Sequence, residues 1–262
     1  MLETLAFFSN SLVASLLLSV AIAIIGSLML INRYNYLAAA IAHGSYGGVG
    51  MALYLGISVL LGATLFALAL AALLAFITLR ETRHDILISL LWATGMSIGI
   101  IFVDLTPGYH TDLLAYLFGD ILMVPKEDIY FMAAVDTLLI LFITLFYNHL
   151  LAIAYDREFA ILRGLRVNLL HTLTLMMMAL TIVMSIRSIG LILVIALFSL
   201  PPYIAEKFTK SFRSMIILSA LIALGLFLIG LWISYLFDIS ASASIILCAA
   251  ALFLITYHKG GR

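Results

Sequence analysis

The feature that most restricts the fold of this chain is an unbroken apolar run at residues 9–31. Such a run exceeds the roughly 20 residues that an α-helix needs to cross the hydrocarbon core of a bilayer. Residues 215–237 form a second run of this kind. Because the apolar residues are continuous and do not alternate with polar ones, a transmembrane β-barrel is excluded. We therefore predict an all-α protein whose helices cross a lipid bilayer several times.

The composition agrees with this class. Of the 262 residues, 65% are hydrophobic and 10% are charged, whereas a soluble domain carries about a quarter charged residues. The net charge is zero, so nothing indicates a nucleic-acid partner. Residues 1–10 lack the basic start of a cleavable signal peptide, so we expect the first helix to be retained.

Nine segments are candidate spanning helices. The second contains several glycines, and the seventh is short and contains Pro201-Pro202. We expect the prolines to interrupt the seventh segment, because proline removes a backbone donor and kinks a helix. An arrangement of eight helices, with one of these two segments re-entrant, stays open. The nine segments are residues 5–31, 36–55, 57–79, 86–104, 129–152, 169–187, 189–206, 212–237 and 240–258.

Basic residues are unevenly divided between the two sides that these spans define. When the loops are assigned alternately, 11 of the 13 basic residues fall on one side, and only Lys126 and Arg187 fall on the other. The positive-inside rule makes the basic side cytoplasmic. We predict an outer N-terminus and a cytoplasmic C-terminus. The basic side carries Arg33, Arg80, Arg83, Arg157, Arg163, Arg166, Lys207, Lys210, Arg213, Lys259 and Arg262.

The segment 105–128, on the predicted outer side, is the longest stretch outside the spans. Its turn signal Pro107-Gly108 is followed by LLAYLFGDILMV, an apolar piece too short to span, which we interpret as a re-entrant or interfacial helix. The segment also holds acids that could meet an arriving cation, or that could simply lie in a solvated loop. The polar candidates are His110, Asp112, Asp120, Glu127 and Asp128.

A second segment outside the spans, residues 154–168 on the predicted cytoplasmic side, has the pattern of a short amphipathic helix. Asp156 is a suitable N-cap and Glu158 lies in the first turn. Phe159 and Leu162 fall on one side of this helix, and Gly164 could end it. The pattern allows two interpretations: a helix that inserts into a groove of a partner protein, or an ordinary helix on the membrane surface.

Sequence motifs of catalysis are absent. The chain has no G-x-x-x-x-G-K-[ST], no H-E-x-x-H and no G-x-S-x-G. Its six histidines are scattered, and its single cysteine, Cys248, lies in an apolar run. We therefore predict that the chain is not an enzyme and binds no cofactor of its own.

The stretch AAAIAHGSYGGVG places one histidine inside an apolar segment. Helical spacing puts Ala39, Gly47 and Gly50 on the face of His43. A polar ring within a bilayer is unfavourable unless it faces a cavity, water or a partner, and imidazole is a common ligand of transition metals. Two interpretations compete: a packed histidine at a helix crossing, or a histidine that looks into open space on a transport path.

Five stretches match one family pattern in order and at fitting spacings. They are INRYNYLAAAIAHGSYGGVGMAL, LLAYLFGDILMV with Asp112 before it, AYDREFAILRGLRVN, RSIGLILVIALFSLPPYIAEKFTKSF and SASASIILCAAALFLI. Each stretch alone is a weak signal, but the five together are specific. The chain thereby resembles the permease subunits of zinc, manganese and iron ABC importers, almost from end to end.

This resemblance implies a type II importer fold with a single permease domain, residues 1–262, that works as a homodimer in the cytoplasmic (inner) membrane of a prokaryote. A separate ATP-binding cassette ATPase subunit would hydrolyse ATP, and an extracytoplasmic solute-binding protein would deliver a divalent metal as the substrate. The resemblance makes His43 the metal ligand. It places Ser45, Tyr46, Gly47, Asp112 and Tyr203 on the transport path, and Asp156, Glu158, Phe159, Ala160 and Gly164 in ATPase coupling.

Two positions depart from the family pattern. Ala39 replaces an aspartate four residues before His43, and Pro202-Tyr203 replaces a pair of small residues. Without the carboxylate, one protomer offers a single imidazole, and a dimer offers two. This loss favours an alternative, an ABC permease for a metal chelate or small organic solute. A further alternative is an ion-coupled secondary transporter with Asp104 and Asp136 as a proton relay.

Overall fold

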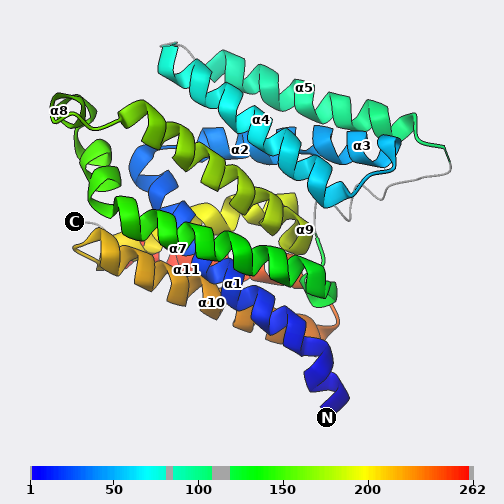
Figure 1. Ribbon diagram of the computed structural model, residues 1–262. Helices are drawn as coiled ribbons and strands as arrows, with labels where there is room; N and C mark the ends of the chain where they lie inside the picture. The colour runs from blue at the N-terminus through cyan, green and yellow to red at the C-terminus, as the bar shows by residue number, and fades with distance from the viewer. Residues whose placement is uncertain (1, 81–84, 108–118, 260–262) are drawn as a thin grey trace. The chain divides into compact units, whose positions relative to one another are not determined.

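The computed structural model describes residues 2–80, 85–107 and 119–259. The regular elements within these ranges are all helices, so the all-α prediction is confirmed (Figure 1). The elements are α1 (Leu2–Asn32), α2 (Asn35–Gly44), α3 (Tyr46–Leu55), α4 (Val59–Arg80), α5 (Asp85–Asp104), the 3₁₀ turn η1 (Ile121–Met123), α7 (Lys126–Tyr155), α8 (Arg157–Leu162), α9 (Val167–Phe208), α10 (Phe212–Phe237) and α11 (Ala241–Lys259).

Six helices in the described part of the chain are long and apolar enough to cross a membrane, and this confirms a multi-pass membrane protein. Large apolar side chains such as Leu141, Leu221 and Ile229 are exposed on them. In water such exposure would be unusual, whereas lipid accommodates it. The six are the part of α1 from Ser9 to Asn32, α4, α5, α7, α9 and α10, and α11 contributes the shorter apolar stretch Ala241–Tyr257.

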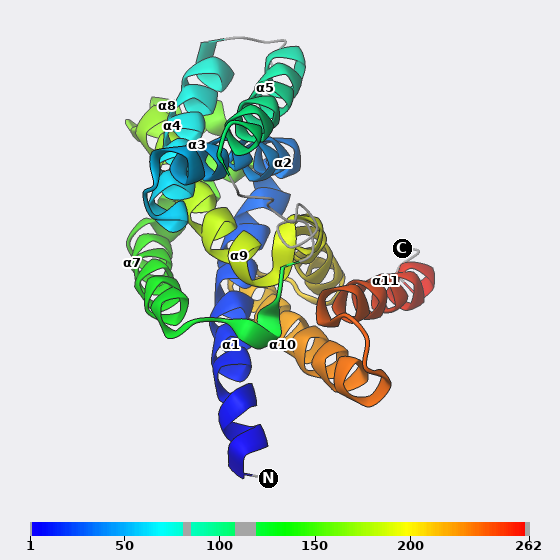
Figure 2. The same cartoon turned by 90° about the vertical axis from the view of Figure 1, so that its right-hand side faces the viewer.

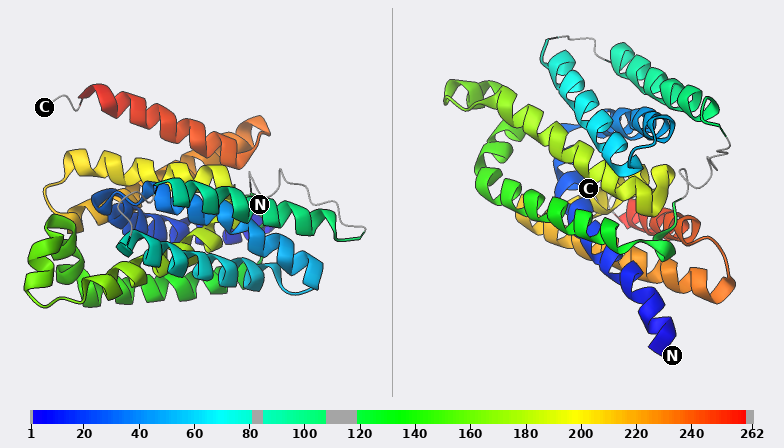
Figure 3. Two further views of the ribbon diagram at one scale, coloured as in Figure 1. Left: turned by 90° about the horizontal axis from the view of Figure 1, so that it is seen from above. Right: turned by 45° about the vertical axis from the view of Figure 1, so that its right-hand side comes forward.

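The chain forms two compact units, each assembled from separated segments. In the first unit α1 packs against α10, and α10 packs against α11, which is red in Figure 3. A hydrogen bond connects α1 to the residues that precede α7: Asn10 Nδ2 donates to the carbonyl of Val124 over 3.2 Å. This unit comprises Met1–Arg33, Leu113–Ile140 and Met184–Arg262.

The second unit contains α2 to α5, the end of α7, α8 and the start of α9. Here α3 packs against both α4 and α5 (Figure 2). Residues 36–55, which we expected to form one helix, form two helices of 10 residues each, separated at Ser45. The unit comprises Tyr34–Asp112 and Leu141–Val183.

The prediction that Pro201-Pro202 interrupts the seventh segment is wrong. The helix α9 continues through both prolines to Phe208, and its non-helical residue is Gly190, with φ 78° and ψ 162°. Only glycine adopts this conformation readily. Proline at position 202 leaves the carbonyl of Phe198 without its helical donor. Gly26 of α1 lies against that carbonyl so closely that a Cβ would overlap it, and this packing accommodates the proline.

Candidate functional site

The histidine in the opening motif, His43, lies in the last turn of α2 and stacks on Trp92 of α5. The two ring centroids are 4.3 Å apart and the ring planes differ by 20°. The helices α2 and α3 run in the same direction as α5. Residues further along α2 and α3 contact residues further along α5. The contacts in order are Tyr36 with Ser89, His43 with Trp92, Gly47 with Gly95, Gly50 with Gly99 and Tyr54 with Phe102.

Glycines bring these helices together. A Cβ on Gly47 would overlap the carbonyl of Gly95, and a Cβ on Gly50 would overlap the backbone of Gly99. Small residues allow such close approach between membrane helices. The prediction that the face of His43 looks into open space is therefore wrong, since this same face packs against α5. Tight packing around a half-buried imidazole leaves the ring little freedom to turn.

One ring nitrogen of His43 has no protein partner. Its Nδ1 atom is buried and, among the described residues, makes no hydrogen bond. Ala39, at the position of the expected acid, is buried as well. The neighbouring Ser45 hydroxyl donates to the carbonyl of Ala42 over 2.8 Å, so its proton is already used. A buried polar atom without a partner is rare and needs an explanation.

The described residues contain no group of three or more His, Cys, Asp or Glu side chains that could hold a metal ion. His43 in this unit is thus a single imidazole without a carboxylate beside it. Of the other predicted path residues, Tyr46 is buried in α3. Asp112 and His110 lie outside the described residues.

Tyr203 lies in the first unit, in the last part of α9. Its ring contacts Phe253 of α11 with centroids 5.7 Å apart, and the ammonium of Lys207 lies 4.9 Å from the centre of the Tyr203 ring. Lys207 also faces Tyr257 at 5.2 Å. These cation–π contacts fix the end of α9 against α11.

The predicted amphipathic helix is α8, which connects α7 to α9 (Figure 1). Asp156 is its N-cap, as predicted, and its Oδ1 atom accepts a hydrogen bond from the Phe159 amide over 2.9 Å. Gly164, with φ 77°, follows its last turn in a left-handed conformation. Ala160 is buried, whereas the Phe159 and Leu162 side chains are 48% and 86% exposed.

A second histidine, His171 of α9, is buried and bonded at both nitrogens. Its Nε2 atom lies 2.8 Å from Thr78 Oγ1 of α4, and its Nδ1 atom lies 2.7 Å from the Tyr34 hydroxyl. The Thr78 hydroxyl donates its proton to the carbonyl of Leu74, so it accepts from Nε2–H. The neutral ring therefore carries its proton on Nε2, and the Tyr34 hydroxyl donates to Nδ1. Burial raises the pKa of Tyr34 to about 12, against a smaller lowering by Arg157.

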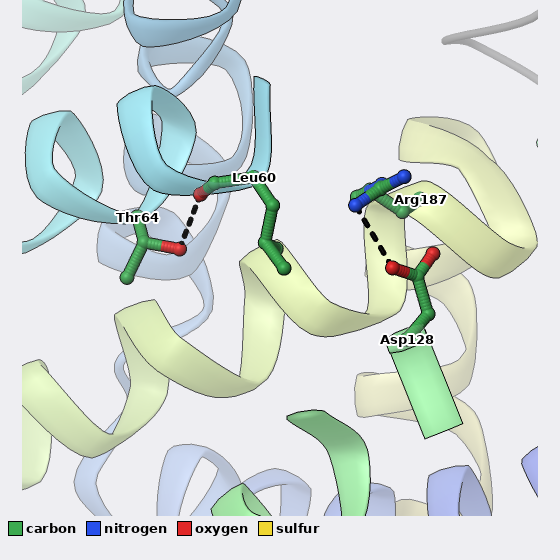
Figure 4. Close-up of polar contacts among 4 residues, drawn as sticks. All are labelled: Leu60, Thr64, Asp128 and Arg187. Atoms are coloured by element: carbon green, nitrogen blue, oxygen red, sulfur yellow. Dashed lines mark hydrogen bonds and ion pairs between the residues drawn. The ribbon is translucent and has the colours of Figure 1, made fainter. Parts of the chain in front are cut away.

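The described part of segment 105–128 is held by an ion pair within the first unit. The Arg187 guanidinium of α9 lies 2.8 Å from Asp128 Oδ1 in the first turn of α7 (Figure 4). Asp120 caps η1 by accepting from the Leu122 amide over 2.9 Å. A Cβ on Gly119 would overlap the backbone at Gly190, where α9 is interrupted. Of the predicted re-entrant piece, residues 113–124, the structure describes residues 119–124, and within these only η1 is helical. Residues 113–118 lie outside the described part of the chain.

The six described helices that are long and apolar enough to cross a membrane define a multi-pass membrane protein. The chain matches the ABC 3 transport family over residues 4–260, and it belongs to that family. This membership confirms the predicted resemblance, and it confirms a transporter subunit in place of an enzyme. It overturns the alternative of an ion-coupled secondary transporter.

The chain is also similar to individual proteins in sequence and in structure. The membrane protein slr2045 of Synechocystis sp. is 39% identical over 251 residues, which cover 95% of this chain and 89% of that protein. The manganese import system permease protein ScaB of Streptococcus gordonii is 30% identical, covering 96% of this chain and 90% of ScaB. The solved structure of PsaBC from Streptococcus pneumoniae in complex with Fab matches with a TM-score of 0.86 and 30% identity, covering 98% of this chain and 94% of that chain.

Proposed function

We propose that this chain is the permease of an ATP-driven importer for a divalent transition metal: manganese, zinc or iron. The observation that carries the proposal is the single imidazole of His43 in α2, whose Nδ1 atom is buried and makes no hydrogen bond among the described residues. Imidazole suits borderline transition metals. Membership in an ABC transport family and similarity to a manganese import permease support the choice of cargo. The metal is cargo, and the chain needs no resident cofactor.

The proposed path residues of the second unit are His43, Ser45, Tyr46 and Gly47. The family resemblance adds Tyr203 of α9 as a further candidate. We propose that the working form is a homodimer, so that two copies of His43 share a cation that one imidazole would hold weakly. Asp112 would meet the cation on the outer side. A weak station suits transport, because tight binding would retain the ion.

We propose nine spans, an outer N-terminus and a cytoplasmic C-terminus, in the inner membrane of a prokaryote. The six long helices, a second segment of α9 beyond Gly190, the pair α2–α3 and the apolar part of α11 account for nine. The parallel course of α2–α3 and α5, with α4 between them in sequence, fits alternate crossings. The uneven distribution of basic residues supports the orientation.

The proposed docking element for the ATPase is α8 with its capping residues. Its exposed apolar side chains, Phe159 and Leu162, provide a contact surface, and Asp156, Ala160 and Gly164 fix the shape of the helix. Glu158 is exposed in the first turn. ATP binding would bring two ATPase subunits together and move α8. That motion would switch the dimer between outward- and inward-facing states, while an extracytoplasmic solute-binding protein supplies the metal.

Uptake in cells tests this function. The His43→Ala variant should lose at least tenfold in initial uptake of radioactive manganese or zinc at limiting concentration, with an unchanged amount of assembled permease–ATPase complex. His149→Ala, on α7, is the matched control and should transport normally. Normal uptake by His43→Ala for each of manganese, zinc and iron would contradict the proposal.

A second candidate function is supported by Ala39. Because that position lacks a carboxylate, an ABC permease for a metal chelate or a small organic solute remains the alternative. ATPase activity of the reconstituted complex separates the two. Stimulation by a free divalent metal with its binding protein supports the metal importer, and stimulation only by a chelate or an organic solute supports the alternative.

A further inference from the structure

Within the described residues, Trp92 is the aromatic side chain that stacks on the His43 ring. The two ring planes differ by 20° and the ring centroids are 4.3 Å apart, so the indole lies in close contact with the face of the imidazole. Trp92, Gly95 and Gly99 fall on one face of α5, at spacings of three and four residues. The same α5 face that bears the indole therefore also makes the close glycine contacts with α2 and α3.

These contacts fix the indole relative to the imidazole. The backbones of Gly44 and Gly95 approach so closely that a Cβ on Gly95 would overlap Gly44, the residue after His43. Gly47 lies one helical turn beyond His43 and meets the Gly95 carbonyl in the same way. Because backbone contacts flank the stacked pair, α5 cannot shift along α2 without steric overlap. The position of the indole is therefore set by the helix contact.

A metal-binding imidazole is normally oriented by a hydrogen bond from its second nitrogen to a carboxylate or carbonyl. His43 lacks this device, since Ala39 stands where the acid would be and Nδ1 has no partner among the described residues. Stacking can replace it. An aromatic ring that lies flat on the imidazole fixes the ring plane, and the ring plane fixes the direction of the nitrogen lone pair.

We propose that Trp92 is the positioning residue of the cation station at His43: its indole holds the imidazole plane so that a ring nitrogen is presented to a divalent transition metal. This inference rests on the proposed function, because it takes His43 as the ligand of the cargo. It adds that the station is built by α2 and α5 together, and that stacking replaces the carboxylate that orients the ring elsewhere.

The chain offers a direct optical test, because it contains only two tryptophans, Trp92 and Trp232. Trp232 of α10 is 65% exposed and lies in the other unit, so Trp232→Phe leaves Trp92 as the only tryptophan of this chain. The emission of the same complex with Trp92→Phe added is subtracted, which removes the signal of the tyrosines and of the ATPase subunit. The purified permease–ATPase complex in lipid nanodiscs is titrated with Mn²⁺ and Co²⁺. Both ions should quench Trp92 emission saturably, and Mg²⁺ should not. In the same background His43→Ala should abolish the saturable quench.

Equilibrium binding of radioactive manganese to the immobilised complex tests Trp92 itself, because this readout does not depend on the fluorophore. Trp92→Leu should weaken apparent affinity about tenfold, and Trp92→Phe, which keeps a stacking ring, should restore most of it. Size-exclusion chromatography and the melting temperature show whether each variant is assembled. A folding defect would change those quantities in Trp92→Leu, whereas a positioning role changes affinity at equal assembly.

The outcomes separate this inference from the proposed function. Loss of binding in His43→Ala with full affinity in Trp92→Leu overturns the role of Trp92 and leaves the metal importer intact. Saturable manganese binding without any quench of Trp92 also overturns it, because a stacked indole must sense the ion. Binding that survives His43→Ala overturns the proposed station and the inference together. If Trp92→Leu does not assemble, the comparison of Trp92→Phe with wild type and the quench titration decide.

Discussion

Two histidines of the same unit, His43 and His171, differ in the hydrogen-bond partners of their ring nitrogens. Both nitrogens of His171 have hydrogen-bond partners, Tyr34 and Thr78. His43 has a stacked indole and a buried Nδ1 atom without a described partner. A buried polar atom without a hydrogen bond destabilises the folded protein by about 1–3 kcal/mol. The unpaired Nδ1 atom of His43 therefore does not contribute to stability, and a functional reason for it has to be sought. This difference is the reason we propose a structural role for His171 and a cargo-binding role for His43.

The largest effect concerns the helix contact beside His43. Gly50→Leu places a side chain where a Cβ already overlaps Gly99, and should destabilise the protein by at least about 3 kcal/mol. Little assembled complex should be recovered, and its thermal unfolding should shift down by several degrees. Gly225→Leu on α10 is the matched control, because a Cβ there meets nothing within 4 Å. Equal melting temperatures for the two variants would disprove the close contact.

The next effect concerns the satisfied histidine. His171→Leu removes both hydrogen bonds and leaves the Tyr34 hydroxyl without its acceptor, so stability should fall by about 2 kcal/mol. Thr78→Val, which removes only one partner, should cost about half as much. The assembled fraction of both variants should bind manganese with wild-type affinity. Weakened metal binding at an unchanged melting temperature would reverse the roles assigned to the two histidines.

A smaller effect is expected at α8. Asp156→Ala removes the N-cap of this short helix, worth about 1 kcal/mol. Hydrogen exchange of the Phe159 amide should accelerate about fivefold, and the ATPase subunit should dissociate more readily. Glu158→Ala is the control. Within the described part of the chain the Glu158 side chain makes no hydrogen bond to the helix end, so this variant should leave the exchange rate unchanged. Unaltered exchange in Asp156→Ala would contradict the capping geometry.

The smallest effect is the pH dependence carried by Tyr34. Its pKa is raised by burial to about 12, so the folded state holds the phenolic proton more tightly than the unfolded state. The resulting contribution to stability is complete below about pH 10 and is lost as pH rises toward 12. Thermal unfolding of Tyr34→Phe should therefore depend less on pH in this window than that of wild type. Identical profiles would show that Tyr34 does not lose its proton there.

Much of the fold could be read from the sequence, because apolar length alone identifies helices such as α1 and α10. The N-cap at Asp156 was also predictable, since capping is decided by residues three positions apart. The continuation of α9 through Pro201-Pro202 was not predictable. Two prolines are a strong local signal, and only the approach of Gly26 from another helix explains why the helix continues.

For the two histidines as well, the sequence predicted one part of the site and could not predict another. Periodicity singled out His43 and its glycines, but it could not show that their face packs against α5, because Trp92 lies 49 residues further along the chain. The partners of His171, Tyr34 and Thr78, come from two segments that are distant from α9 in the sequence, and no spacing within one helix brings them together. Sequence patterns thus located the candidate ligand and missed the residues that surround it.

The most direct measurement is equilibrium binding of radioactive manganese or zinc to the purified permease–ATPase complex, compared between His43→Ala and His171→Leu. The roles assigned to the two histidines predict that His43→Ala loses saturable binding while its melting temperature is kept. They predict that His171→Leu melts earlier and keeps its affinity in the assembled fraction. Wild-type affinity in His43→Ala, or loss of affinity only in His171→Leu, would contradict the central claim.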